Sequence, residues 1–135
     1  MSKIKKGVSK RDIKVGPIQI FVSNIEKANK WYSEILGMKL IKKYPPFKCI
    51  LMKWGEIEFD IGTPIPEWGE GWDKVVVGGR TNIFFETSNI KQTVKELKQT
   101  GVKFIEDPSK RVWGEFKAVF VDPDGNEFNL IEIKK

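Results

Sequence analysis

The sequence contains no histidine and only one cysteine, Cys49, among its 135 residues. The lack of histidine removes the side chain that most often serves as a catalytic base near neutral pH and as a transition-metal ligand. Proton transfer would therefore depend on carboxylates, lysine, tyrosine or Cys49, and a metal site would need mainly oxygen ligands. A single cysteine cannot form an internal disulfide, so we expect a reducing, cytoplasmic location.

Long apolar segments are also missing. No apolar run approaches the roughly 20 residues that cross a bilayer. No apolar stretch follows the basic residues at the amino terminus, as a secretory signal would require. We therefore expect one soluble domain without a membrane partner. With 40% hydrophobic and 31% charged residues, its composition is that of an ordinary globular protein.

The positive charge is concentrated at the amino terminus. The net charge is +6, but six of the 24 basic residues and one acid precede Val15, which leaves 18 basic and 17 acidic residues in the rest of the chain. We interpret residues 1–14 as a flexible basic arm that keeps the protein soluble. We do not expect nucleic acid as a partner. The alternative, an arm that attracts anionic partners, would show as a steep salt dependence of binding.

The remainder of the chain contains an internal repeat. The triplet Ser23–Ile25 recurs as Ser88–Ile90, 65 positions later, and the segment Gly37–Ile41 recurs as Gly101–Ile105, 64 positions later. Two copies that stay in register indicate a duplicated supersecondary unit. Such units usually meet around a shared groove, so the repeat indicates where a site would lie but not what it binds.

Each copy predicts a strand, a helix and three further strands. Apolar residues alternate in the first strand of each copy and then recur at helical spacing after Asn24 and Asn89, which are well placed as helix caps. Gly37 and Gly101 close the helices, because glycine enters the left-handed conformation at little cost. The predicted strands span residues 18–22, 38–42, 47–54, 57–62, 83–87, 102–105, 115–121 and 127–133.

The expected fold class is therefore α+β, with two tandem β-α-β-β-β modules that form a curved mixed sheet around a cavity. Module one spans residues 15–62, a linker 63–81, and module two 82–135, all within one domain of residues 15–135. One helix cannot cover both faces of four strands, so one face of each sheet stays open. Strand alternation places on these open faces Gln19, Phe21, Asn82, Phe84 and Glu86.

Two short sequences carry a resemblance to a known family. The run from Val22 to Gly37 resembles the opening of the vicinal oxygen chelate superfamily, which includes glyoxalases, bleomycin-resistance proteins and ring-cleaving dioxygenases. The segment Val119–Asn126 resembles the hairpin near the carboxyl end of these proteins, and its Asp122–Asn126 portion predicts a turn. The resemblance implies the paired-module glyoxalase/bleomycin-resistance-like fold and a homodimer with pockets between two units.

The resemblance also implies four inward positions at which enzymes of the superfamily hold a divalent metal. In this sequence they are Pro17, Asp60, Asn82 and Asn129. Proline has no ligating side chain and asparagine is a weak neutral donor, so we expect no metal and no other cofactor. A register shift of two residues would offer Gln19 or Glu58 and Glu127 instead. That shift leaves an oxygen-ligated magnesium or manganese site as the alternative.

The metal-free members of the superfamily bind a bulky small molecule in the groove. We therefore expect a binder of a small aromatic or cationic molecule, because aromatic side chains and inward acids would suit such a ligand. The alternative is a lyase, isomerase or dioxygenase that uses inward carboxylates, with Asp60, Glu58 and Glu127 as catalytic candidates. The two linker tryptophans would either cover the ligand or cap the core. The expected ligand-binding residues are Gln19, Phe21, Asp60, Asn82, Phe84, Glu86, Asn129, Trp54, Trp68 and Trp113.

Overall fold

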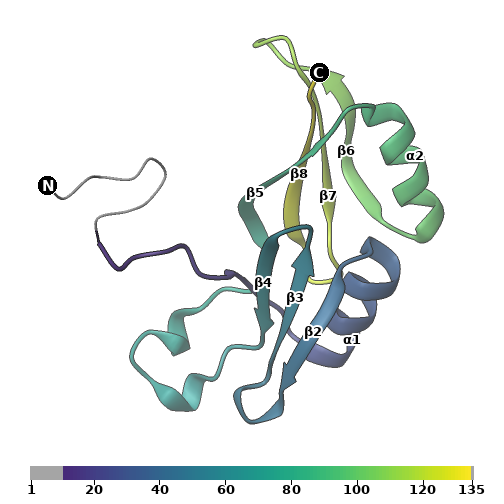
Figure 1. The fold of residues 1–135 in the computed structure, drawn as a ribbon. Helices are drawn as coiled ribbons and strands as arrows, with labels where there is room; N and C mark the ends of the chain where they lie inside the picture. The colour runs from purple at the N-terminus through teal and green to yellow at the C-terminus, as the bar shows by residue number, and fades with distance from the viewer. Residues whose placement is uncertain (1–10, 135) are drawn as a thin grey trace, which may run out of the picture.

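The protein is described here by a computed structural model, which covers residues 11–134. Each half of the chain forms a four-stranded sheet with a helix against one side (Figure 1). Module one contains β1 (Ile18–Phe21), α1 (Ile25–Lys30) continued by a π-helix (Trp31–Leu36), β2 (Lys39–Tyr44), β3 (Cys49–Trp54) and β4 (Ile57–Gly62). Module two contains β5 (Gly79–Thr87), α2 (Ile90–Thr100), β6 (Lys103–Lys110), β7 (Phe116–Val121) and β8 (Asn126–Glu132).

The two sheets have the same topology. Their strand orders are β1-β4-β3-β2 and β5-β8-β7-β6, and in each the first strand runs parallel to the last while the other pairs are antiparallel. This confirms the duplicated unit and the α+β class. Strand β3 begins two residues later than expected: Pro45–Phe47 form a 3-10 turn and Lys48 has a φ of 51°, so β3 starts at Cys49 rather than at residue 47.

The predicted helix caps are confirmed. The Asn24 side chain accepts a hydrogen bond from the Lys27 amide at 3.0 Å, and Asn89 does the same for the Gln92 amide at 3.1 Å. These bonds satisfy amides that a helix start would otherwise leave unpaired. The spacing of apolar residues does not predict the π-helix, which widens the second half of the first helix before Gly37 ends it in the left-handed conformation.

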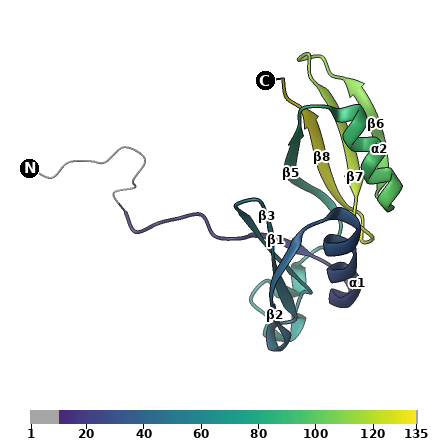
Figure 2. The ribbon, with the colours of Figure 1, turned by 45° about the vertical axis from the view of Figure 1, so that its right-hand side comes forward.

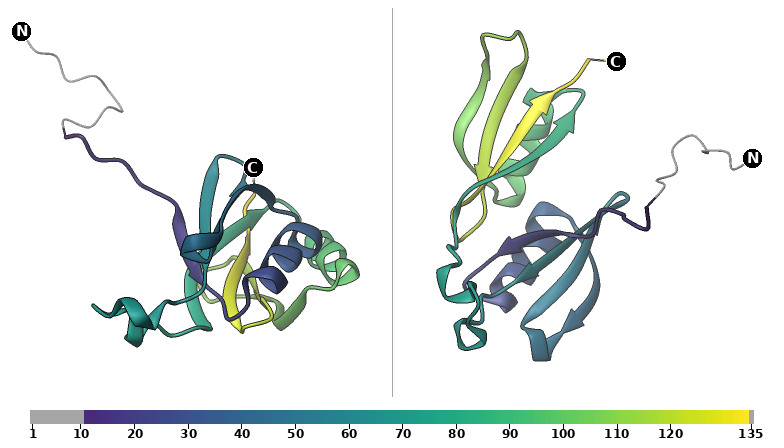
Figure 3. Two further views of the ribbon diagram at one scale, coloured as in Figure 1. Left: turned by 90° about the horizontal axis from the view of Figure 1, so that it is seen from below. Right: turned by 90° about the vertical axis from the view of Figure 1, so that its left-hand side faces the viewer.

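Both helices lie on the same side of the molecule, and both sheets present their other face to the opposite side. Figure 2 shows α1 and α2 next to each other, and the right panel of Figure 3 shows the sheets in front of them. The helix-facing side chains form the core, in which Tyr32, Phe120 and Phe128 are almost completely buried. The core is continuous across the modules, because the Tyr32 ring meets the Phe128 ring edge-on at 6.2 Å.

The predicted turn between β7 and β8 joins the modules. Asp122 is 4% exposed and its carboxylate accepts hydrogen bonds from the Tyr32 hydroxyl at 2.6 Å and from the Asn126 side chain at 2.7 Å. The same Asn126 amide donates to the Phe21 carbonyl at 2.9 Å. Asp124 accepts from the backbone and the hydroxyl of Ser23. The segment Asp122–Asn126 therefore has two roles. It forms the predicted turn, and its polar side chains hold β1 and α1 against module two.

The linker leaves module one after Thr63 and rejoins module two at Gly78. Gly78 has a φ of 95°, and a Cβ there would approach the Asp124 carbonyl oxygen to 2.7 Å, so only glycine fits. Between these points the linker extends away from both sheets and forms two 3-10 turns, Pro66–Trp68 and Trp72–Lys74 (Figure 1). Within residues 11–134, no helix has the length and apolar character needed to cross a bilayer.

Candidate functional site

The open face of module one carries a carboxylate with an unsatisfied oxygen. Gln19, Asp60 and Leu51 lie side by side across β1, β4 and β3, and Phe21 is a diagonal neighbour of Asp60 on the same face. The Asp60 Oδ1 atom is buried and has no hydrogen-bond partner among the described residues. Buried polar atoms are nearly always paired, so an unpaired carboxylate oxygen indicates a position that a donor from outside the chain could fill.

Cys49 shares this face with Asp60. Partial burial of the thiol, followed by the negative charge of the nearby Asp60 carboxylate, raises the pKa of Cys49. A raised pKa keeps the thiol protonated at neutral pH, so Cys49 is a poor nucleophile and a poor metal ligand there. Cys49 packs closely against Gly62 on β4, where an added Cβ would approach the Cys49 Cβ to 2.9 Å.

The open face of module two combines an exposed ring with charged groups. Phe84 is 56% exposed, and the Lys117 ammonium lies over its ring at 6.0 Å from the centroid. Asn129 lies next to Phe84, and its side-chain amide donates to the Ile83 carbonyl at 3.3 Å. These side chains border a cavity of about 130 Å³ whose lining also includes Arg80, Asn82, Glu106, Val119 and Glu127.

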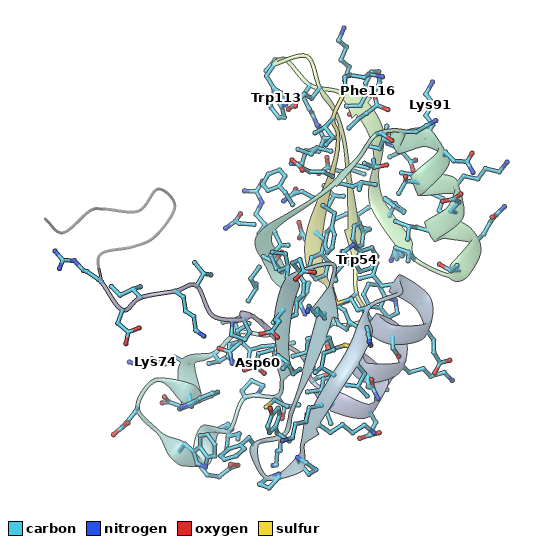
Figure 4. All side chains as sticks on the ribbon, viewed as in Figure 1. Trp54, Asp60, Lys74, Lys91, Trp113 and Phe116 are labelled. Atoms are coloured by element: carbon cyan, nitrogen blue, oxygen red, sulfur yellow. The ribbon has the colours of Figure 1, made fainter. Side chains whose placement is uncertain are left out.

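The predicted ligand-binding residues lie in five places, and Figure 4 labels Asp60, Trp113 and Trp54 in three of them. Gln19, Phe21 and Asp60 share the open face of module one, with Glu58 further along β4 opposite Lys53. The open face of module two brings together Asn82, Phe84 and Asn129 with Glu127, and Glu86 lies further along β5. Trp113 is 59% exposed at the tip of the β6–β7 hairpin. Trp68 lies in the linker, where it contacts Phe47 and Trp72.

Trp54 lies in the cavity between the two modules, whose lining also includes three other predicted ligand-binding residues, Asn82, Phe84 and Glu86. It contacts the Phe85 ring at a centroid distance of 5.6 Å, on the helix side of β5, and therefore faces away from the open sheets. With Ile57 and Phe59 it lines a cavity of about 800 Å³ between the modules, closed on the other side by residues of β5 and α2. Trp54 and Ile57 are 39% and 52% exposed, so this apolar groove faces solvent in one chain.

The side chains at the family's metal positions do not fit a divalent ion. Pro17 has no donor atom, Asn82 and Asn129 offer only neutral amides, and the one carboxylate, Asp60, lies on the other sheet. Divalent magnesium, calcium and manganese favour several carboxylate or other oxygen ligands around one point. Within residues 11–134, no group of three or more cysteine, aspartate or glutamate side chains is arranged to hold an ion.

Comparison with known proteins places this fold in a family. The sequence profile of the glyoxalase/bleomycin resistance protein/dioxygenase superfamily matches residues 14–130. The chain belongs to this superfamily. A superfamily member from Sphaerobacter thermophilus has a similar solved structure, with a TM-score of 0.74 and 31% identity over 90% of this chain and 98% of that one.

Two curated relatives are similar over most of their length. The protein YetH of Bacillus subtilis is 27% identical over 126 residues, which cover 87% of this chain and 97% of that protein. A probable lactoylglutathione lyase of Synechocystis is also 27% identical over 126 residues, which cover 84% and 90%. Membership of the glyoxalase/bleomycin resistance/dioxygenase superfamily confirms the resemblance drawn from the sequence.

Sequence reasoning missed the role of Asp122. The sequence predicts a turn at Asp122–Asn126, and Tyr32 stands among the residues at helical spacing after Asn24, but neither pattern pairs Tyr32 with Asp122. A tyrosine in such a stripe needs a partner for its hydroxyl once it is buried, and this requirement was the available signal. Burial, followed by the charge of Asp122 and the hydrogen bond with it, raises the pKa of Tyr32 well above the usual tyrosine range.

Proposed function

We propose that this member of the superfamily binds a small aromatic or cationic molecule on its open sheet faces without a metal ion. The observation that carries the proposal is the unpaired, buried Oδ1 of Asp60 beside Phe21. A cationic nitrogen of the ligand would donate to this oxygen, and hydrogen bonds that involve charged groups are shorter and stronger than neutral ones. A planar ligand would also remove the Phe21 and Phe84 rings from water.

The charges on the two faces support a cationic ligand more strongly at module one. There, Asp60 has one oxygen without a partner among the described residues. In module two, Glu106 already pairs with the Arg111 guanidinium, and Lys117 lies over the Phe84 ring. We therefore assign the charged end of the ligand to Asp60 and an uncharged, ring-containing part to Phe84.

We also propose a homodimer in which a second copy covers the apolar groove between the modules. In one chain the open faces belong to separate sheets, and β1 and β5 each pair with only one neighbouring strand. The groove of about 800 Å³ between the modules exposes Trp54 and Ile57. Apolar patches of this kind mark association surfaces. Light scattering should give twice the 15.6 kDa of one chain, and a monomer at all concentrations would contradict the dimer.

A ligand panel tests the binding proposal. The protein, treated with EDTA, is titrated with planar aromatic cations such as proflavine and with uncharged ring compounds such as acridine, and binding is followed by fluorescence. We expect saturable binding of at least one cation. We also expect Asp60→Asn to weaken that binding by roughly 10- to 150-fold, the effect of a hydrogen bond to a charged group.

The matched control is Asp107→Asn. It makes the same chemical change at an exposed carboxylate that pairs with Lys98 on the helix side of module two. Wild-type affinity is expected for this control. The proposal fails if the whole panel gives no saturable binding, or if Asp60→Asn binds the selected cation as tightly as the unaltered protein does.

A second proposal is an enzyme of the lyase, isomerase or dioxygenase kind. It is supported by the relative from Synechocystis named as a probable lactoylglutathione lyase, and by Glu127, which lies beside Arg80 on the open face of module two. In that case Glu127→Gln should abolish turnover of a superfamily substrate while the protein stays folded. Absence of turnover in the unaltered protein across glyoxalase and dioxygenase assays would remove this candidate.

A cytoplasmic location stays a prediction, based on the single cysteine. The basic arm of residues 1–14 lies mostly outside the described residues. Its effect on partners is tested by removing residues 1–14 and comparing binding to anionic polymers at low and high salt.

A further inference from the structure

Four aromatic rings connect the linker to module one in a continuous series. The Trp72 ring meets Phe21 at a centroid distance of 6.0 Å and Trp68 at 5.5 Å, and Trp68 in turn meets Phe47 at 6.2 Å. We call these four residues the linker aromatic cluster. Each contact is nearly perpendicular, with interplanar angles of 90°, 88° and 75°. Perpendicular rings form corners in which one small group can touch two ring faces.

The outer part of this cluster is open to water. Trp68 is 48% exposed and Phe47 is 56% exposed, whereas Trp72 and Phe21 are partly buried. Trp68 therefore does not cap the core, which was one of the two roles considered for it. Large aromatic surfaces left in water favour an occupant, because covering them gains hydrophobic free energy.

The same segment is negatively charged in a protein that is otherwise basic. Glu67, Glu70 and Asp73 alternate with the two tryptophans, and Lys74 is the one basic residue between positions 64 and 74, so the segment carries a charge of −2 against +6 for the whole chain. Among residues 11–134, none of these three acids forms an ion pair. Their field favours a cation near the exposed rings.

Local structure holds the two tryptophans at a right angle. The Gly69 amide donates to the Pro66 carbonyl at 3.0 Å and the Trp72 amide to the Gly69 carbonyl at 2.9 Å. Between the tryptophans the backbone passes through positive φ values of 65° at Gly69, 48° at Glu70 and 94° at Gly71. This turn fixes the backbone positions from which the two rings extend, which lowers the entropy cost of binding.

We propose that the linker aromatic cluster binds a small quaternary alkylammonium cation, such as the trimethylammonium group of choline, in the corner formed by Trp68 with Phe47 or Trp72. Cations of this kind are attracted to ring faces and have no N–H that must keep a hydrogen bond to water. The neighbouring carboxylates supply the opposite charge. The cluster reaches the open face of module one through Phe21, but the corner at Trp68 does not depend on Asp60.

The test compares choline with 3,3-dimethylbutan-1-ol, which has the same shape but a carbon atom in place of the charged nitrogen. The full-length protein is titrated with each at constant ionic strength, and the indole N–H signals are followed by nuclear magnetic resonance. We expect saturable shifts of the Trp68 signal with choline and clearly weaker binding of the uncharged compound. Equal binding of the two compounds, or no saturation with choline, overturns the proposal.

Variants locate the site. Trp68→Leu should weaken choline binding by about 2- to 30-fold, the range expected for loss of one cation–π contact. Trp113→Leu is the matched control, because Trp113 is similarly exposed but lies on the β6–β7 hairpin at the opposite end of the molecule (Figure 4). Trp68→Phe keeps a ring and should retain part of the affinity. Unchanged choline binding in Trp68→Leu, with the remaining signals at their original positions, also overturns the proposal.

Discussion

Replacement of Tyr32 by phenylalanine tests how the two modules are held together. The Tyr32 side chain is 0% exposed, and its hydroxyl donates to the Asp122 carboxylate at 2.6 Å across the module boundary. Phenylalanine preserves the ring contacts with Trp31 and Phe128 and removes only the hydroxyl. The substitution therefore isolates one hydrogen bond between a buried phenol and a buried carboxylate.

The expected loss of unfolding free energy in Tyr32→Phe follows from the negative charge of the Asp122 carboxylate. A hydrogen bond to a charged group contributes about 1.5–3 kcal/mol to the free energy of unfolding. Three other donors on Asp122 remain, the amides of Asp124 and Asn126 and the Asn126 side chain, so the carboxylate does not become an isolated buried charge. For a chain of this size the loss lowers Tm by roughly 5–15 °C.

Thermal and urea unfolding of both proteins measure this difference. Tyr44→Phe is the matched control, because Tyr44 is partly exposed and its hydroxyl has no hydrogen-bond partner among residues 11–134. We expect a change of only a few tenths of a kcal/mol for that control. If Tyr32→Phe unfolds at the same temperature as Tyr44→Phe, the bond between Tyr32 and Asp122 does not hold the modules together and the reasoning is refuted.

Two further measurements address the open face and the dimer. Burial and the charge of Asp60 raise the pKa of Cys49. Alkylation of Cys49 by iodoacetamide should therefore be slow at pH 8 and should accelerate only as the pH rises through that raised pKa. The Asp60→Asn variant should be alkylated faster at pH 8. An alkylation rate at pH 8 equal to that of the urea-unfolded chain would contradict this. Ile57→Glu places a charge in the groove between the modules and should halve the mass measured by light scattering. A dimer that survives this change would show that the groove is not the interface.

Much of the fold could be predicted because the sequence contains two copies of the same β-α-β-β-β pattern. The spacing from Asn24 to Gly37 and from Asn89 to Gly101 marked both helices, and the caps at these residues are as expected. The alternation of side chains along each strand also assigned the open faces correctly. When every second residue is apolar and packs against the helix, the residues between them must lie on the open face. Ile20 and Ile83 face the helices, while Gln19 and Phe84 do not.

The candidate site could be predicted only within each module. Gln19, Phe21 and Asp60 meet because strand pairing is local to module one, and the same holds for Phe84 and Asn129 in module two. Contacts that depend on how the modules and the linker pack were not accessible from periodicity. The bond between Tyr32 and Asp122 and the contact of Trp54 with the helix side of module two are of this kind.

The most direct test of the binding proposal is an isothermal titration of the EDTA-treated protein with the tightest-binding cation of the panel, repeated after manganese is added. We expect saturable binding with the same Kd in both experiments, since Pro17 has no donor atom and Asn82 and Asn129 offer a metal only neutral amides. Binding that occurs only once manganese is present would contradict the account.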